Sequence, residues 1–265
     1  VVVGSSTINA NRVVGDPFDS GRNLAGRVGT DFKMGIGPNL TLDATVNPDF
    51  GQVEADPAEV NLSAFATRFP ERRPFFTEGS RLLTTPNQSK FFYSRRIGAR
   101  PTGPASGDYV DYPDAATILL AGKVTGRLPS RTSVAILGAV TDEEFARIAA
   151  ADAPGVTKVR VAPRTAYGVA RVQQEFGTLG STVSAQVASL HRNLKAGDPL
   201  ANLLSRNAVT YGADSLLRFK GGEYELVWAA LGTLVTGEAG ALTAIQRSPE
   251  HYMQRPDQDY SKIDP

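Results

Sequence analysis

The sequence predicts an all-β fold of antiparallel hairpins with one long inserted segment, and three observations lead to this prediction. Apolar and polar residues alternate over stretches of about ten residues, as in half-buried strands. Short turns rich in glycine or proline join these stretches in pairs. Residues 48–114 break this rhythm, because they are rich in proline, charge and aromatic side chains and do not alternate.

The first hairpin is expected near the N-terminus. Apolar residues take alternate positions of two stretches, from Leu24 to Ile36 and from Leu40 to Val46, opposite charged or small residues. Gly37-Pro38-Asn39 supplies a tight turn between them. The pattern therefore predicts one strand over 24–36 and a second strand paired with it.

Three further hairpins follow the inserted segment. In the first of their strands, Ile118, Leu120 and Val124 share the apolar face, opposite Lys123. The last hairpin has Gly221-Gly222 as a strong two-residue turn signal. The expected strands are 115–127, 131–141, 166–176, 181–191, 207–219 and 223–235.

The connections between hairpins are long. Residues 142–164 are expected to form a loop that starts with a helical turn, TDEEFARIAA, and residues 192–206 a second loop. One more strand is expected near 240–247. Short turns at one end of the strands and long loops at the other are typical of outer-membrane barrels.

The inserted segment is expected to begin with a helix near 57–69. Asp56 is a natural N-cap, Pro57 fits the first helical position, and Glu59 completes a capping box. Apolar residues recur at helical spacing from Leu62 onward, and Pro70 ends the helix. A connection of this length needs a packing or functional role.

Composition limits the functions that are open to the chain. A formal net charge of +1 gives no reason to expect a nucleic-acid partner. The absence of cysteine excludes disulfides and thiolate chemistry, and two histidines argue against a histidine-based metal site. We therefore expect neither a metal nor another cofactor. The first residues do not have the pattern of a signal peptide.

Four motifs carry a family resemblance. They are NPDFGQVEADPAEVNLSAF at 47–65, FPERRPFF at 69–76, FYSRRIG at 92–98 and HYMQRPD at 251–257. With them the chain resembles a bacterial family of uncharacterised proteins, in which a family-9-type carbohydrate-binding domain precedes a long β-rich region thought to be an outer-membrane barrel. The resemblance implies that residues 1–265 are one barrel segment of a longer protein, with lipid and carbohydrate as partners.

Alternation alone leaves two architectures open. In a soluble sandwich the apolar face meets the core, whereas in an outer-membrane barrel it meets lipid and the polar face lines the lumen. Strand length, loop asymmetry and aromatic residues near strand ends favour the barrel. The aromatic residues are Phe219, Tyr224, Tyr167 and Phe176, placed where an interfacial girdle is expected. We expect the segment 48–114 to pack as a plug within or over it.

Two groups of residues in the inserted segment could carry chemistry. Its carboxylates could act as a pair in glycoside hydrolysis, but capping and nearby arginines explain them more simply, so no catalytic residue is assigned. Arg95 and Arg96, together with Tyr93, could bind an anionic or sugar ligand. The residues expected to cap or hold the plug are Asp49, Asp56, Glu59, Glu71, Arg72, Arg73 and Glu78.

These observations favour a non-enzymatic outer-membrane protein that binds or passes a solute or glycan. The alternatives are a polysaccharide-acting enzyme or carbohydrate-binding accessory, a soluble β-sandwich domain, and a purely structural role.

Overall fold

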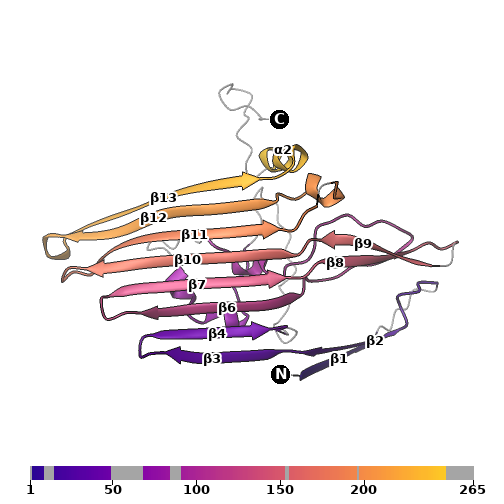
Figure 1. The fold of residues 1–265 in the computed structure, drawn as a ribbon, viewed down its shortest axis with the longest axis horizontal. Coiled ribbons are helices and arrows are strands. Elements are labelled where there is room, and N and C mark those ends of the chain that lie inside the picture. The colour runs from indigo at the N-terminus through magenta and orange to yellow at the C-terminus, as the bar shows by residue number, and fades with distance from the viewer. Residues whose placement is uncertain are drawn as a thin grey trace.

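An eight-stranded antiparallel sheet dominates the computed structural model, which describes residues 2–8, 15–48, 68–83, 91–152, 155–195 and 197–248. The strand order is β13-β12-β11-β10-β7-β6-β4-β3 (Figure 1). The bounds are β3 (Thr30–Ile36), β4 (Leu40–Val46), β6 (Ile118–Arg127), β7 (Thr132–Thr141), β10 (Thr165–Phe176), β11 (Ser181–Arg192), β12 (Asn207–Phe219) and β13 (Tyr224–Thr236).

Two smaller sheets and several short helices complete the described part of the chain. One sheet pairs β1 with β2, and the other has the order β5-β8-β9. The remaining elements are β1 (Val2–Ile8), β2 (Arg22–Val28), β5 (Tyr109–Asp111), β8 (Glu144–Ala149), β9 (Val156–Ala162), α1 (Pro74–Thr77), α2 (Ala239–Arg247), and the 3-10 turns η1 (Ser80–Leu83), η2 (Ser94–Arg96), η3 (Pro199–Asn202) and η4 (Lys220–Gly222).

The connections differ at the two ends of the large sheet. Short turns join β3 to β4, β6 to β7, β10 to β11 and β12 to β13, and the strand registers place them all at one end, which we call the turn end. The longer connections leave and re-enter the large sheet at the opposite, loop end, and the β5-β8-β9 sheet lies at that end (Figure 1). The predicted loop asymmetry is therefore confirmed.

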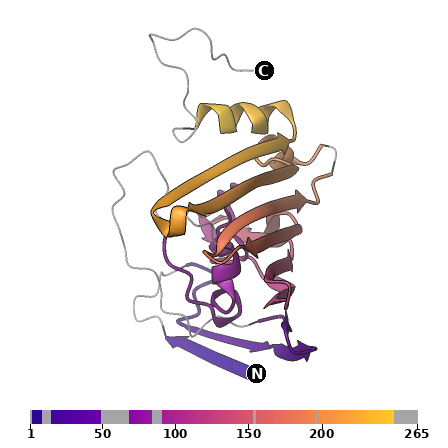
Figure 2. The ribbon, with the colours of Figure 1, turned by 90° about the vertical axis from the view of Figure 1, so that its left-hand side faces the viewer.

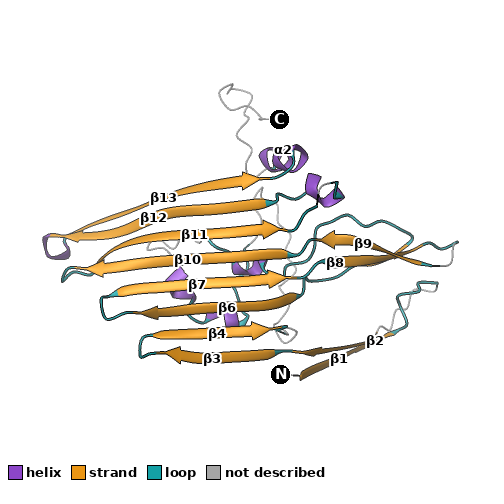
Figure 3. Cartoon of the chain, in the orientation of Figure 1, coloured by secondary structure: helices purple, strands orange, loops and turns teal. Residues whose placement is uncertain are grey.

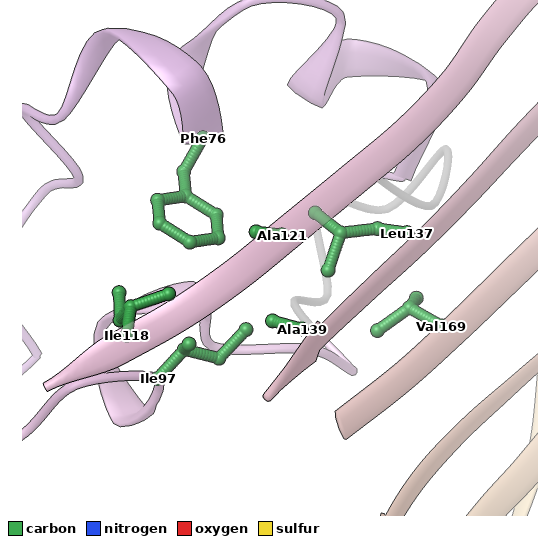
Figure 4. Packing of buried hydrophobic residues seen from close by; sticks show 7 residues of the cluster. All are labelled: Phe76, Ile97, Ile118, Ala121, Leu137, Ala139 and Val169. Carbon is green, nitrogen blue, oxygen red and sulfur yellow. The ribbon is translucent and has the colours of Figure 1, made fainter. Parts of the chain in front are cut away.

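The molecule has two layers. Residues 68–83 and 91–116, which we call the inner segment, lie on one face of the large sheet, and the sheet curves around them (Figure 2). The short helices of the inner segment lie on that face as well (Figure 3). Phe76 and Ile97 of the inner segment pack against Ala121, Leu137 and Val169 of the central strands (Figure 4).

The all-β, antiparallel prediction is confirmed, with three local corrections. The first concerns residues 24–36, which form two strands, not one. Gly29 separates β2 from β3, because Asn47 crosses there: a Cβ at Gly29 would lie 2.5 Å from the Asn47 carbonyl oxygen. The Asn47 amide also donates to the Val28 carbonyl at 2.7 Å.

The second correction concerns residues 142–164, where a loop with a helical turn was expected. The chain instead forms the β8–β9 hairpin. A single short helix is only marginally stable, whereas Val156–Ala162 is rich in β-branched residues and offers a strand partner.

The third correction concerns residues 240–247, where a strand was expected. They belong to α2, because alanine, leucine and glutamine favour the helix. Its Ala241 is fully buried, and the helix contacts η3.

Some predictions fall outside the described residues or are left open. The helix near 57–69, with Asp49, Asp56 and Glu59, and the HYMQRPD motif are not among the described residues. The sheet is open within the described part of the chain, since β3 and β13 each have one strand neighbour there. The observed fold is thus an open antiparallel sheet with an inner layer.

Candidate functional site

The two faces of the large sheet differ in charge. Residues directly opposite each other in neighbouring strands share a face, so the registers assign every side chain to the face that bears the inner segment or to the outer face. Every charged residue of the eight strands, all of which the structure describes, falls on the inner face. These residues are Asp31, Lys33, Asp43, Lys123, Arg127, Arg171, Glu175, Arg192, Asp214, Arg218 and Glu225.

The outer face is apolar and exposed. Its central strands carry only small, β-branched or aliphatic residues, apart from a few uncharged polar ones near strand ends. Ile136 in β7 is 50% exposed, and Trp228 in β13 is 42% exposed. The large exposed side chains of this face are Phe32, Met34, Ile36, Val46, Leu120, Ile136, Val172, Phe176, Val183, Val187, Tyr211, Phe219, Tyr224, Leu226, Trp228 and Leu234.

Two residues depart from the predicted faces. Tyr167, expected in an aromatic girdle, lies on the inner face, where it packs against the core. Ile118 does not lie with Leu120 and Val124 on the outer face, because the register shifts between Ile118 and Leu120. Such a bulge turns a side chain to the opposite side of the sheet. Ile118 is therefore buried in the core beneath the inner segment.

A buried ion pair occupies the inner face of β10–β12. Arg171 and Asp214 are each 1% exposed, and Arg171 Nη2 donates to Asp214 Oδ1 at 2.8 Å while its Nη1 donates to Asp214 Oδ2. The guanidinium also donates to Gln186 Oε1 at 2.6 Å and to Ser184 Oγ at 2.9 Å. This bidentate geometry offsets much of the desolvation of both charges, while Arg171 Nε has no hydrogen-bond partner among the described residues.

A second charge cluster fastens the inner segment to the sheet. Lys123, which is 4% exposed, donates to the Phe75 carbonyl and, at 2.8 Å, to the Glu78 carbonyl. Its ammonium lies 3.6 Å from Asp43. Lys33 on the edge strand β3 binds the Glu78 carboxylate at 2.6 Å. The inner segment is thus held to the sheet by these polar contacts in addition to the hydrophobic core around Phe76 and Ile97.

Glu71 and Arg73 organise the inner segment itself. Glu71 accepts hydrogen bonds from Arg73 Nη2 at 2.7 Å and from Ser94 Oγ at 2.6 Å. Arg73 in turn donates to the carbonyls of Ile97 at 2.7 Å and Ser94 at 2.9 Å. These bonds join residues 71–73 to residues 94–97, so the two parts of the inner segment form one unit.

The electrostatics of Glu71 and Glu78 argue against glycoside hydrolysis at this pair. Burial alone would raise the pKa of Glu71, but hydrogen bonds from Arg73 and Ser94 outweigh it and lower the pKa. The hydrogen bond from Lys33 likewise lowers the pKa of Glu78. A general acid needs a raised pKa, so these carboxylates suit a structural role.

The predicted ligand-binding residues have different surroundings. The Tyr93 hydroxyl accepts from the Phe69 amide at 3.0 Å, and Arg95 donates to the Pro70 carbonyl at 3.0 Å, so both hold the backbone of the inner segment. Arg96 instead lines a cavity of about 340 Å³ together with Arg100. Of the remaining predicted plug residues, Arg72 is exposed.

Sequence reasoning placed Arg171 and Asp214 on polar faces but did not pair them. The sequence did contain a signal for this pair. Arg171 and Asp214 have opposite charges, and each lies near the middle of its strand. It also missed Arg192, the third arginine of the cavity, because strand spacing alone does not show which loop residues approach a strand end.

The described residues show no metal-binding cluster of acidic or histidine side chains. Within the same residues, no helix is long and apolar enough to cross a bilayer.

Comparison with known families identifies the chain. A family model described as "Domain of unknown function (DUF5916)" matches residues 8–208. The chain belongs to this family. The DUF5916 match runs from the end of β1 to the start of β12, so it includes the inner segment and most of the large sheet. No curated protein and no solved structure matches the chain. The expected membership of an uncharacterised family is confirmed.

Proposed function

We propose that the large sheet is a sector of an outer-membrane β-barrel wall, with its outer face against lipid and its inner face toward a lumen that the inner segment partly fills. The observation that carries this proposal is the distribution of charge. All charged residues of the eight strands lie on the inner face, whose central part the inner segment covers, and the outer face is uncharged and mostly apolar.

A soluble sheet has the opposite requirement. It buries its apolar face and leaves its polar face in water, and a sandwich does so by packing the apolar faces of two sheets together. Here the inner segment covers the face that carries the charges, where it also forms a small hydrophobic core, and the more apolar outer face is the one left exposed (Figure 2). An exposed apolar surface of this size needs a partner, and hydrocarbon is the partner that covers a continuous face without side-chain complementarity.

The lengths of the strands and the positions of their aromatic residues agree with a sheet that crosses a lipid bilayer. The six strands from β6 to β13 in the large sheet have 10 to 13 residues, and a tilted strand needs about 9–11 residues to cross a bilayer. Phe176, Phe219 and Tyr224 lie on the outer face at the turn end, where an interfacial aromatic girdle would be.

Closure of the wall requires additional strands on β3 and β13. The long exposed edge of β13 would otherwise be a site for uncontrolled pairing. In this arrangement the protein is a non-enzymatic envelope barrel that binds or passes a small solute. The inner segment determines how wide the remaining lumen is. Because the family resemblance implies carbohydrate as a partner, we include glycans among the solutes that the protein binds or passes.

Trp228, the only tryptophan of the chain, gives a direct test. Its indole lies on the outer face, so acyl-chain-brominated lipids should quench its fluorescence strongly after reconstitution into vesicles. A matched probe is the variant Trp228→Phe with Phe92→Trp, which moves the indole to the inner segment packed against the core. That probe should stay unquenched. Equal quenching of both probes, or of neither, would overturn the proposed orientation.

A further inference from the structure

A cavity of about 340 Å³ opens on the inner face at the loop end of the sheet. Its walls come from the ends of β7, β10 and β11, from residues 96–102 of the inner segment, and from the end of β9. Segments distant in the sequence therefore meet at this one place. Its volume lies within the range of small-molecule sites, about 300–1,000 Å³.

The cavity has an excess of positive charge. Arg96, Arg100 and Arg192 line it, and the lining contains no carboxylate among the residues that the structure describes. A second cavity, of about 330 Å³, shows the contrast. There Lys33 and Lys123 are paired with Glu78 and Asp43, so the charges compensate each other.

Contacts that do not depend on a ligand hold the three arginines. Arg192 Nη1 donates to the Ser205 carbonyl at 2.8 Å and to Ser205 Oγ at 3.0 Å. The guanidinium of Arg100 lies 5.2 Å from the ring centre of Tyr112. The Arg96 carbonyl accepts from the Tyr167 hydroxyl at 3.4 Å, which fixes the backbone of Arg96 against the sheet.

Three guanidinium groups around one cavity repel each other unless an anion lies between them. Guanidinium matches carboxylate and phosphate with two parallel hydrogen bonds, and it remains charged at any physiological pH. Thr141, Thr165 and Tyr167 line the same wall. The hydroxyls of Thr165 and Tyr167 already donate to the carbonyls of Pro163 and Arg96, so their oxygens can act as acceptors for hydroxyls of a ligand.

We infer that this cavity binds an oxyanion, a carboxylate or phosphate group, carried by a molecule no larger than a monosaccharide. Arg96, Arg100 and Arg192 bind the anionic group, and the threonine and tyrosine hydroxyls contact the rest of the ligand. The inference does not require the membrane proposal, because the cavity lies on the covered face in either case.

Titration calorimetry on the purified folded protein tests this site, with glucuronate, glucose and inorganic phosphate as probes. Glucuronate or phosphate should bind and neutral glucose should not. Binding of phosphate alone would assign the site to phosphate groups, and binding of glucuronate alone to sugar acids. Failure of both anions to bind, or equal binding of glucose, would overturn the inference.

Two charge-matched variants locate the binding. Arg96→Gln should weaken binding of the anion by about tenfold or more, because it removes a charge-assisted hydrogen bond. Arg127→Gln removes the same charge at the turn end, where Arg127 pairs with Glu175, and should leave the affinity unchanged. Equal loss of affinity in both variants would show only a general effect of net charge and would overturn the assignment.

Discussion

The outer face of the large sheet is mostly apolar and exposed, whereas the inner face carries every charge of the eight strands and is covered by the inner segment at its central strands. The outer face offers dispersion and hydrophobic burial to any apolar partner. The inner face combines a small hydrophobic core with specific polar contacts, such as Arg171 with Asp214 and Lys123 with the carbonyls of Phe75 and Glu78.

The two faces differ in how strictly they require particular residues. On the inner face the buried ionic contacts depend on matched partners, so single substitutions at these buried charges should have large effects. On the outer face individual residues are interchangeable so long as they stay apolar. Replacing an apolar residue of the outer face with a charged one, by contrast, should destabilise the protein.

The largest effect is expected at the buried ion pair of the inner face. Asp214→Ala leaves the guanidinium of Arg171 buried without its carboxylate and should lower the free energy of unfolding by about 3–5 kcal/mol. Denaturant unfolding of the folded protein measures this loss.

The neighbouring inner-face variant Thr210→Ala is the control and should change stability by less than about 0.5 kcal/mol. The double variant Arg171→Met with Asp214→Leu should recover most of the loss, because it removes both charges. A wild-type stability for Asp214→Ala would contradict the importance of the pair.

The second largest effect is expected when a charge is introduced on the outer face. Ile136→Arg places a charge in the middle of the apolar surface and should destabilise the protein by about 2–4 kcal/mol in a bilayer. Unfolding in lipid vesicles measures the change. Thr178→Arg, in an exposed turn, should be neutral. If Ile136→Arg is neutral as well, the outer face meets water.

The smallest effect concerns the pH dependence of the inner segment. Because the folded-state pKa of Glu71 is lowered, its stabilising contribution is complete above the ordinary glutamate pKa of about 4.3 and is lost as the pH falls through the lowered value. Hydrogen exchange of residues 91–98 should therefore be slow at pH 7 and accelerate in acid.

In Glu71→Gln, this pH-dependent part should disappear, and exchange at pH 7 should already be faster by roughly tenfold, or about 1.4 kcal/mol. Ser133→Ala, on the inner face of β7 and away from Glu71, should keep the wild-type pH profile. An unchanged acid response in Glu71→Gln would assign the titration to another group.

Much of the sheet could be predicted from the sequence, because each strand carries its own period-two pattern. The pairs at 166–191 and 207–235 were predicted with nearly their observed bounds. Local pattern was insufficient where a partner decided the outcome. Residues 144–149 became a strand because β9 pairs with them, and Ile118 changed faces because of a bulge.

The candidate site was less predictable for the same reason. The sequence identified Arg95, Arg96 and Tyr93 as a group, but adjacent residues in a 3-10 turn point in different directions. Only Arg96 faces the arginine-lined cavity, and its partner Arg192 is 96 positions further along the chain.

The sequence by itself determined the strands, their hairpins and the separation of apolar from charged residues, because these depend on neighbours along the chain. The tertiary structure decided which face was covered. It placed the inner segment on the charged face, where the carbonyls of Phe75 and Glu78 accept hydrogen bonds from the buried Lys123 and where Phe76 and Ile97 complete a hydrophobic core. That choice left the apolar face open, and it brought three arginines together around one cavity.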